Sequence, residues 1–598
     1  MKNNILASIA LFGVYRDKNL DTYDLVAQYI SAVIAQKERT QFTPDVMKED
    51  LYSVFGIDIP FGVIRSVSRN RIEGVSLKQG VFYSELIPKD EIDKEYSELT
   101  EEYDALFKSL ICFMRQVGHI EVDSYSDDDI RNRFADYLLY QYTSESRLNS
   151  YYAAFISENE SNPDVRRQLN LLSSGLISYN GLSYTEDAGN NGAWTERLTI
   201  YLDTEFLFNC SGYNGEYYLK VFDELYNLVN EVNVSYRRRT KKSDNLIDFK
   251  ILNHTLRVYN GFFEQAKKII DSKVAPDPSK KALLKIVHES SSAHDVEEHK
   301  AVIDSVVFDK YHILPDSNEY DNYATDRDYV LFDEKAVTDL NTSFNPRNDS
   351  QVSGRIDYAS RVLTIINGLR GGKKISVFEN CRYIFLTGSR VVRGASYKVA
   401  EKGTVLLSTD IDFLVSRLWF KLNKPLGNSR IPISLDIVSR SQAVLKRDVT
   451  RKVKEYYDDL LKKEYSDDVK KRLYASLKEK CEFLPPYDES SLSQMLAFID
   501  TRDLDAMLEA NKSMMKKAAE AEQKEKELSE LKTELDKTKE ENKGLKQDIA
   551  KKELDHKHQQ DDAALQSDKK DSIIKWLIVA LAVVVIVAIV LALVLILK

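Results

Sequence analysis

The feature that most constrains this chain is an uncharged apolar stretch over residues 576–597, WLIVALAVVVIVAIVLALVLIL. A helix of this length, at about 1.5 Å per residue, reaches roughly 33 Å and can cross a bilayer. Lys569, Lys570 and Lys575 precede the stretch, and only Lys598 follows it. The sequence therefore predicts a single C-terminal transmembrane helix that anchors the chain to a membrane, with the bulk of the chain in the cytoplasm.

The rest of the chain is too long for one hydrophobic core. The whole chain has 598 residues, and a domain takes about 150, so three to four domains are expected. A net charge of −10 excludes a protein that coats nucleic acid through bulk charge, so any nucleic-acid site must be a local patch. The cysteines Cys112, Cys210, Cys381 and Cys481 form no C-x-x-C pair, which excludes a zinc ribbon and favours a reducing compartment.

Residues 508–560 carry a heptad pattern without proline. Its a positions are Met514, Ala521, Leu528, Leu535, Asn542 and Ile549. The d positions are half polar, so we expect a weak coiled coil, and the single Asn at an a position favours a parallel homodimer. A single solvated helix is the alternative. Residues 561–575 are predicted to be a polar juxtamembrane linker.

The N-terminal region resembles a winged helix-turn-helix over about 70 residues. Three apolar-periodic stretches predict three helices, and IEGVSLKQGVFYSEL predicts a short β-hairpin. In that family the third helix enters the DNA major groove, which makes Arg65, Arg69 and Arg71 contact candidates and puts Lys78 on the wing. Winged helices also serve protein contacts, and nearby acidic residues favour that alternative.

A strand followed by an acid opens the next region. The stretch ERLTIYLD places Asp203 directly after a β-branched and aromatic strand, at the end where open α/β sheets hold ligands. An amphipathic helix follows, and later strands are expected at RYIFLTGS, before Ser389, and at TVLLSTDID, which contains Asp410 and Asp412. The helix GRIDYASRVLTIINGLR carries Asp357 in its first turn. This pattern predicts a parallel α/β sheet.

These residues resemble the PIN-like nucleases, whose carboxylates meet at one end of a parallel sheet and bind Mg²⁺ or Mn²⁺. The resemblance implies Asp203 and Asp357 as catalytic and metal-binding residues. Ser389 stands where the family has a third acid, so Asp410 or Asp412 would replace it, and Glu224 or Glu264 would supply the acid from an intervening helix. An Asp after a strand or at a helix start is also a common cap residue, which is the alternative interpretation.

Two basic groups favour a phosphate backbone as substrate. Arg237, Arg238 and Arg239 follow the first helix of the α/β region, and Lys373, Lys374, Arg390 and Arg393 flank the strand before Ser389. The resemblance then implies a membrane-tethered endoribonuclease that acts on RNA or single-stranded nucleic acid, with stress or phage defence as a setting. Two alternatives stay open: a non-catalytic membrane-anchored scaffold or sensor with a decayed PIN-like site, and a membrane-bound winged-helix regulator.

The expected fold class is multidomain α/β plus α. Its parts are a winged-helix-like α+β module (1–95), a helical connecting region (96–190), a PIN-like α/β domain (197–425) with a helical insertion (about 265–345), a helical region (426–507), the coiled coil (508–560), the linker (561–575) and the transmembrane helix (576–597).

Overall fold

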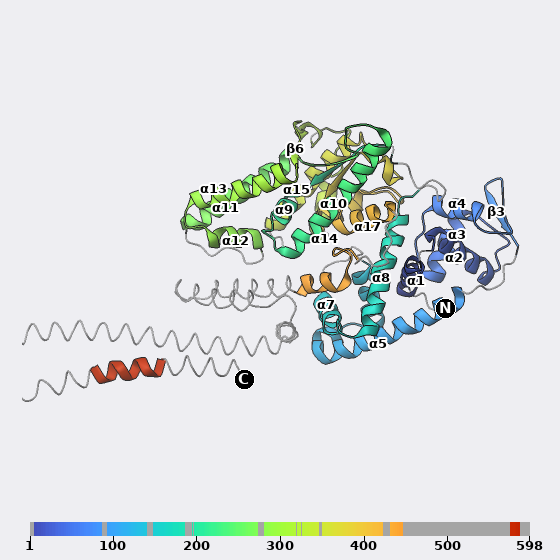
Figure 1. The fold of residues 1–598 in the computed structure, drawn as a ribbon, viewed down its shortest axis with the longest axis horizontal. Coiled ribbons are helices and arrows are strands. Elements are labelled where there is room, and N and C mark those ends of the chain that lie inside the picture. The colour runs from blue at the N-terminus through green and yellow to red at the C-terminus, as the bar shows by residue number, and fades with distance from the viewer. Residues whose placement is uncertain are drawn as a thin grey trace, which may run out of the picture. The chain divides into compact units, whose positions relative to one another are not determined.

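The computed structural model divides into two compact units, Met1–Asp505 and Ala506–Lys598. Figure 1 shows the described elements as coloured ribbons. The structure describes residues 5–18, 20–85, 92–139, 148–185, 194, 196–272, 280–318, 320–324, 326–345, 350–422, 431–445 and 575–585. The predicted coiled coil, the linker except for its last residue, and most of the helical region 426–507 lie outside these residues.

The N-terminal module contains helices and a small antiparallel sheet. Its elements are α1 (Ile5–Asp17), α2 (Thr22–Gln36), β1 (Gln41–Phe42), α3 (Pro44–Phe55), α4 (Phe61–Asn70), β2 (Val75–Lys78) and β3 (Val81–Ser84). β3 lies between β1 and β2. Gln79 and Gly80, both with positive φ, form the two-residue turn of the β2–β3 hairpin, because that conformation matches the twist of the strands. The helices α2, α3 and α4 and the hairpin lie where the sequence predicts three helices and a hairpin, with β1 between α2 and α3.

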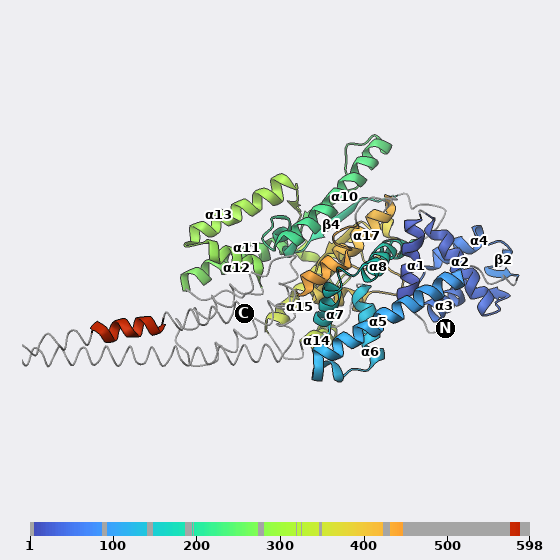
Figure 2. The same cartoon turned by 60° about the horizontal axis from the view of Figure 1, so that its bottom comes forward.

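A helical region follows, and its last helix crosses α1 closely. Its helices are α5 (Ile92–Asp123), α6 (Asp127–Leu138), α7 (Asn149–Glu158) and α8 (Pro163–Leu182). In Figures 1 and 2, α1 lies beside α8. A Cβ on Gly13 would lie 2.1 Å from the Leu171 carbonyl oxygen, and one on Gly175 would lie 1.8 Å from the Ile9 carbonyl oxygen. Only glycine permits these two backbones to approach so closely.

The α/β region is built on a five-stranded parallel sheet. Its strands are β4 (Leu198–Leu202), β5 (Ile247–Ile251), β6 (Leu314–Pro315), β7 (Tyr383–Leu386) and β8 (Ser408–Thr409). Their order is β6-β5-β4-β7-β8, so the chain starts at the central strand, adds two strands on one side and then two on the other. The winding reverses between β4 and β7, and open α/β sheets hold ligands at the carboxyl ends of the strands at such a point.

Helices pack on both faces of this sheet. They are α9 (Thr204–Cys210), α10 (Glu216–Thr240), α11 (Asn253–Ser272), α12 (Lys281–Glu289), α13 (Ala293–Asp304), α14 (Glu334–Phe344), α15 (Ser350–Leu369), α16 (Arg390–Val399) and α17 (Ile411–Lys421), with short helical turns at Ser305–Lys310, Asp321–Ala324 and Phe378–Asn380. Leu198, Ile200 and Leu202 of β4 join a core with α9 to α13 and α17, whereas Tyr201 joins a core with α14, α15 and α16. Alternate side chains of a strand thus serve opposite faces.

The segment 265–345 is not a helical insertion as predicted. It supplies β6, whose Leu314 pairs with Lys250 and whose Pro315 pairs with Ile251 of β5. The segment therefore completes one edge of the sheet, although most of it is helical. A two-residue strand that ends in proline gives almost no strand signal in the sequence.

The structure also corrects the predicted membrane anchor. Of the apolar C-terminal stretch, residues 575–585 are described, as a helix. Residues 586–597 of the predicted span lie outside the described residues. Within the described ranges, no helix has both the length and the apolar character needed to cross a membrane. This finding overturns the predicted single transmembrane helix and, with it, the membrane-anchored localisation.

Candidate functional site

The carboxyl ends of the central strands bring polar side chains to one edge of the sheet. Asp203 follows β4, Thr387 follows β7 and Asp410 follows β8. The strands run parallel and in register, with Leu202 beside Leu386. The residues that follow them therefore meet at the point where the winding reverses, and this edge is the candidate site.

Asp203 is held by three hydrogen bonds from the protein. Its Oδ1 accepts from the backbone N–H of Thr204 at 2.7 Å and from the Tyr358 hydroxyl at 2.9 Å, and its Oδ2 accepts from the Thr387 hydroxyl at 2.6 Å. Burial raises the pKa of the Asp203 carboxyl, and these hydrogen bonds oppose the rise. A carboxylate offers about four acceptor positions, so one is left for any other ligand.

Helix α15 presents Tyr358 to the site, and Asp357 lies exposed. Tyr358 is further held by the Thr255 hydroxyl at 3.1 Å and by the His254 ring, which stacks on it at 5.3 Å between centroids. Successive residues of a helix point about 100° apart, so a helix that turns Tyr358 toward Asp203 turns Asp357 toward solvent. The predicted pairing of Asp203 with Asp357 is therefore wrong.

Glu205 is the second carboxylate beside Asp203. Its Oε1 accepts a hydrogen bond from the backbone N–H of Gly388. A Cβ at position 388 would lie 2.6 Å from that oxygen, so glycine allows the carboxylate to reach the backbone. Burial, and then repulsion from Asp203, raise the pKa of Glu205 to about 7, while Gly388 and Arg393 lower it. Both carboxylates are thus engaged by the protein itself.

Ser389 serves as a helix cap. Its hydroxyl accepts from the backbone N–H of Val392 at 3.5 Å at the start of α16. A Ser at this position satisfies one N–H of the first turn and supplies no negative charge. The position where the PIN-like pattern has its third acid therefore has a structural role.

Asp410 and Asp412 do not replace the missing acid. Asp410 caps α17 through the backbone N–H of Phe413 at 2.8 Å, and its other oxygen forms an ion pair with Arg393 at 2.6 Å. Burial, and then repulsion from Asp410, raise the pKa of Asp412 to about 7. One carboxylate is neutralised by an arginine, and the other is readily protonated near neutral pH.

The two glutamates considered for the intervening helix lie elsewhere. Glu264 is exposed on α11 and pairs with Lys267 at 2.7 Å. Glu224 on α10 accepts from the backbone N–H groups of Ile433 and Ser434 at 3.1 and 3.3 Å. Glu224 therefore fixes the segment that follows α17.

A divalent cation does not fit this arrangement. Mg²⁺ and Mn²⁺ need several oxygen ligands directed at one point. Over the described parts of the chain, no group of three or more His, Cys, Asp or Glu side chains could hold a metal ion. The predicted metal ligands are therefore wrong as a set, and the metal-binding and magnesium predictions are wrong with them. That set was Asp203, Asp357, Glu264, Asp410 and Asp412.

The first basic group lies at the amino ends of the strands, opposite the carboxyl ends where Asp203 lies. Arg237, Arg238 and Arg239 end α10, and the chain then enters the amino end of β5, where Asn245 accepts from Arg237. Asp203 follows the carboxyl end of β4, which is parallel to β5. The predicted closeness of these arginines to the carboxylates is therefore wrong.

The second basic group is divided between the two edges. Lys373 and Lys374 follow α15 and precede β7, at the amino edge, and Lys374 lies 3.8 Å from Glu401. Arg390 and Arg393 begin α16 directly after β7, so they lie at the carboxyl edge with Asp203. Only this second pair lies at the same edge as the carboxylates.

The predicted DNA contacts of the N-terminal module fall into two groups, exposed side chains and one that forms ion pairs within the module. Arg65 and Arg69 are exposed on α4, and Lys78 is exposed at the end of β2. Arg71 instead bridges back to the start of α2, with Asp21 at 2.7 Å and Asp24 at 2.6 Å. Its guanidinium therefore ties α4 to α2, and the prediction that it contacts DNA loses its support.

Sequence reasoning did not identify Glu205, Tyr358, Thr387 or Asp316. Asp316 follows β6 at the same edge and accepts from the Tyr201 hydroxyl at 2.7 Å. Glu205 and Thr387 stand within three residues of a strand end, which is a usable signal for parallel sheets. Tyr358 had no such signal, because an aromatic residue on an amphipathic helix is usually part of the core.

Comparison of the chain with protein-family models, with curated proteins and with solved structures finds no match.

Proposed function

We propose that residues 197–422 form a PIN-like domain that keeps the α/β fold without a working metal centre, and that the chain acts as a non-catalytic scaffold or sensor. The parallel sheet with a buried acid after its central strand supports the resemblance. The domain as proposed carries out no metal-assisted step, because its described residues include no group of three or more side chains that could hold a cation.

One observation carries the proposal: Asp203 accepts three hydrogen bonds, from Thr204, Tyr358 and Thr387. In a metal site this carboxylate would direct its lone pairs at a cation. Here two hydroxyls and a backbone N–H take three of its about four acceptor positions, and the carboxylate is satisfied without a ligand. The same carboxylate therefore has a structural role, in which it ties α9 and α15 to the end of β7.

Cleavage of labelled single-stranded RNA tests this proposal. We expect the full chain with Mg²⁺ or Mn²⁺ to cleave no faster than the same sample in a chelator, because among the described residues no group of three or more His, Cys, Asp or Glu side chains could hold the cation that generates a metal-bound hydroxide. The Asp203→Asn variant should match the wild type, and a metal-dependent ribonuclease provides the positive control. Chelator-sensitive cleavage that Asp203→Asn abolishes would overturn the proposal.

A further inference from the structure

A pocket of about 130 Å³ lies along the edge strand β8. One wall is apolar and consists of Ile384 of β7 together with Val405 and Leu406, which precede β8. This volume is close to the roughly 150 Å³ of an apolar cavity that holds one benzene ring. The pocket therefore has room for a single six-membered ring.

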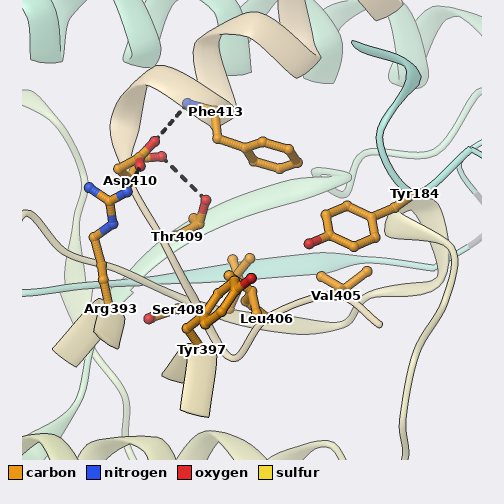
Figure 3. A pocket seen from close by; sticks show the side chains of 10 residues that line it. Tyr184, Arg393, Tyr397, Val405, Leu406, Ser408, Thr409, Asp410 and Phe413 are labelled. Atoms are coloured by element: carbon orange, nitrogen blue, oxygen red, sulfur yellow. Dashed lines mark hydrogen bonds and ion pairs between the residues drawn. The ribbon is translucent and has the colours of Figure 1, made fainter. Parts of the chain in front are cut away.

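Three aromatic side chains surround the pocket, and Figure 3 shows them on different sides of it. Tyr184 and Phe413 meet edge to face, with ring centroids 6.0 Å apart at 73°. Tyr397 of α16 is 68% exposed, so most of its ring is available to a ligand. Aromatic rings in such positions bind planar rings by stacking and edge-to-face contact.

The polar groups of the pocket are few and lie together. Ser408 is 1% exposed, and its hydroxyl has no hydrogen-bond partner among the residues that the structure describes. Thr409 donates only a long bond of 3.4 Å to the Asp410 carbonyl oxygen. The ion pair of Arg393 with Asp410 stands on one side of the pocket (Figure 3). A buried hydroxyl without a partner costs stability, and the Ser408 hydroxyl is too enclosed to be reached from the pocket.

We propose that this pocket binds one pyrimidine base, as a free nucleoside or as one nucleotide of a strand. The volume fits one ring, and the aromatic side chains favour a flat one. Arg393 and Asp410 present a donor and an acceptor side by side, which matches the adjacent carbonyl and N–H groups on the edge of a pyrimidine.

The charges of the pocket favour a neutral ligand. The ion pair of Arg393 with Asp410 cancels itself, and Asp412 and Glu205 lie near it. A phosphate placed at this end would meet these acids, whereas an uncharged base would not. The segment with Lys374 borders the opposite end, because the Val405 N–H donates to the Ile375 carbonyl at 2.6 Å. The phosphates of a bound nucleic-acid strand would therefore lie outside the pocket or toward the end near Lys374.

Calorimetric titration of the full chain with uridine, adenosine and a short oligouridine tests the inference. We expect uridine to bind with a Kd of about 1 mM, and adenosine more weakly because its second ring exceeds the volume. Tyr397→Ala should weaken uridine binding by about tenfold through lost stacking. The matched control is Tyr52→Ala, which removes a tyrosine that is 61% exposed on α3 and should leave binding unchanged.

The outcomes separate the sources of the base. Oligouridine that binds at least tenfold more tightly than uridine, and is sensitive to Tyr397→Ala, supports a strand as the source, and equal affinity supports a free nucleoside. No saturable binding of either ligand, equal binding of adenosine, or equal losses in the two tyrosine variants would overturn the inference. The inference rests on the proposed function as a non-catalytic scaffold or sensor, to which it adds a ligand. Metal-dependent cleavage would refute that function, while failure to bind uridine would leave it intact.

Discussion

Replacing Arg417 by Met is expected to lower the free energy of unfolding by about 3–5 kcal/mol, the typical cost of breaking a buried ion pair. Arg417 is 1% exposed and pairs with Glu379 at 2.5 Å. Its guanidinium also donates to the Gly181 and Ser183 carbonyl oxygens, at the end of α8. The variant leaves the buried Glu379 carboxylate paired with Lys421 alone, at 3.1 Å. It also removes the guanidinium donor from the Gly181 and Ser183 carbonyl groups. Chemical denaturation of the full chain measures the loss.

The matched control for this variant is Arg382→Met. Arg382 pairs with Glu196 at 2.9 Å on the surface, where the two side chains are 61% and 39% exposed, so its loss should cost less than about 1 kcal/mol. Adding Glu379→Gln to Arg417→Met should recover part of the stability, because it removes the uncompensated charge. If Arg417→Met costs no more than Arg382→Met, the buried pair does not hold α8 to the α/β domain.

The stability of the chain is expected to fall as the pH rises from about 5 to about 8, by up to about 3 kcal/mol. Burial raises the pKa of Glu205 from 4.5 to about 7 and that of Asp412 from 3.8 to about 7. A group whose pKa is raised on folding binds its proton more tightly in the folded state. Its contribution is therefore complete below the unfolded pKa and is lost as the pH passes through the folded value. Melting temperature against pH measures this slope.

Two variants assign the slope to its residues. Glu205→Gln and Asp412→Asn keep the shape of each side chain and remove its titration, so each should flatten the curve, and the double variant should flatten it most. Glu264→Gln is the control, because Glu264 is exposed on α11. A melting temperature that is constant or rises over this pH range would contradict the account of these two carboxyls.

Much of the sheet can be predicted from the sequence, because its central strands are buried on both faces. Leu198–Leu202 and Tyr383–Leu386 appear as apolar runs, and Asp203 follows the first of them directly. The edge strand Leu314–Pro315 cannot be predicted, since two residues with a proline carry no pattern. The sequence therefore predicts an insertion where the chain forms this edge strand.

The candidate site was harder to predict than the sheet. A carboxylate after a strand is visible in the sequence, but whether it binds a cation or accepts hydrogen bonds depends on side chains more than 150 residues away. The difference between Asp357 and Tyr358 is one position on α15, and helical periodicity locates an element to within a few residues. The resemblance therefore placed the acid one residue from the side chain that reaches Asp203.

The measurement that tests the central claim most directly is calorimetric titration of the full chain with Mn²⁺ at about pH 7.5, beside the Asp203→Asn variant. We predict no saturable binding below about 1 mM in either protein, because hydrogen bonds from Thr204, Tyr358 and Thr387 occupy the carboxylate that a metal centre would use. Tighter saturable Mn²⁺ binding to the wild type that Asp203→Asn abolishes would contradict this account.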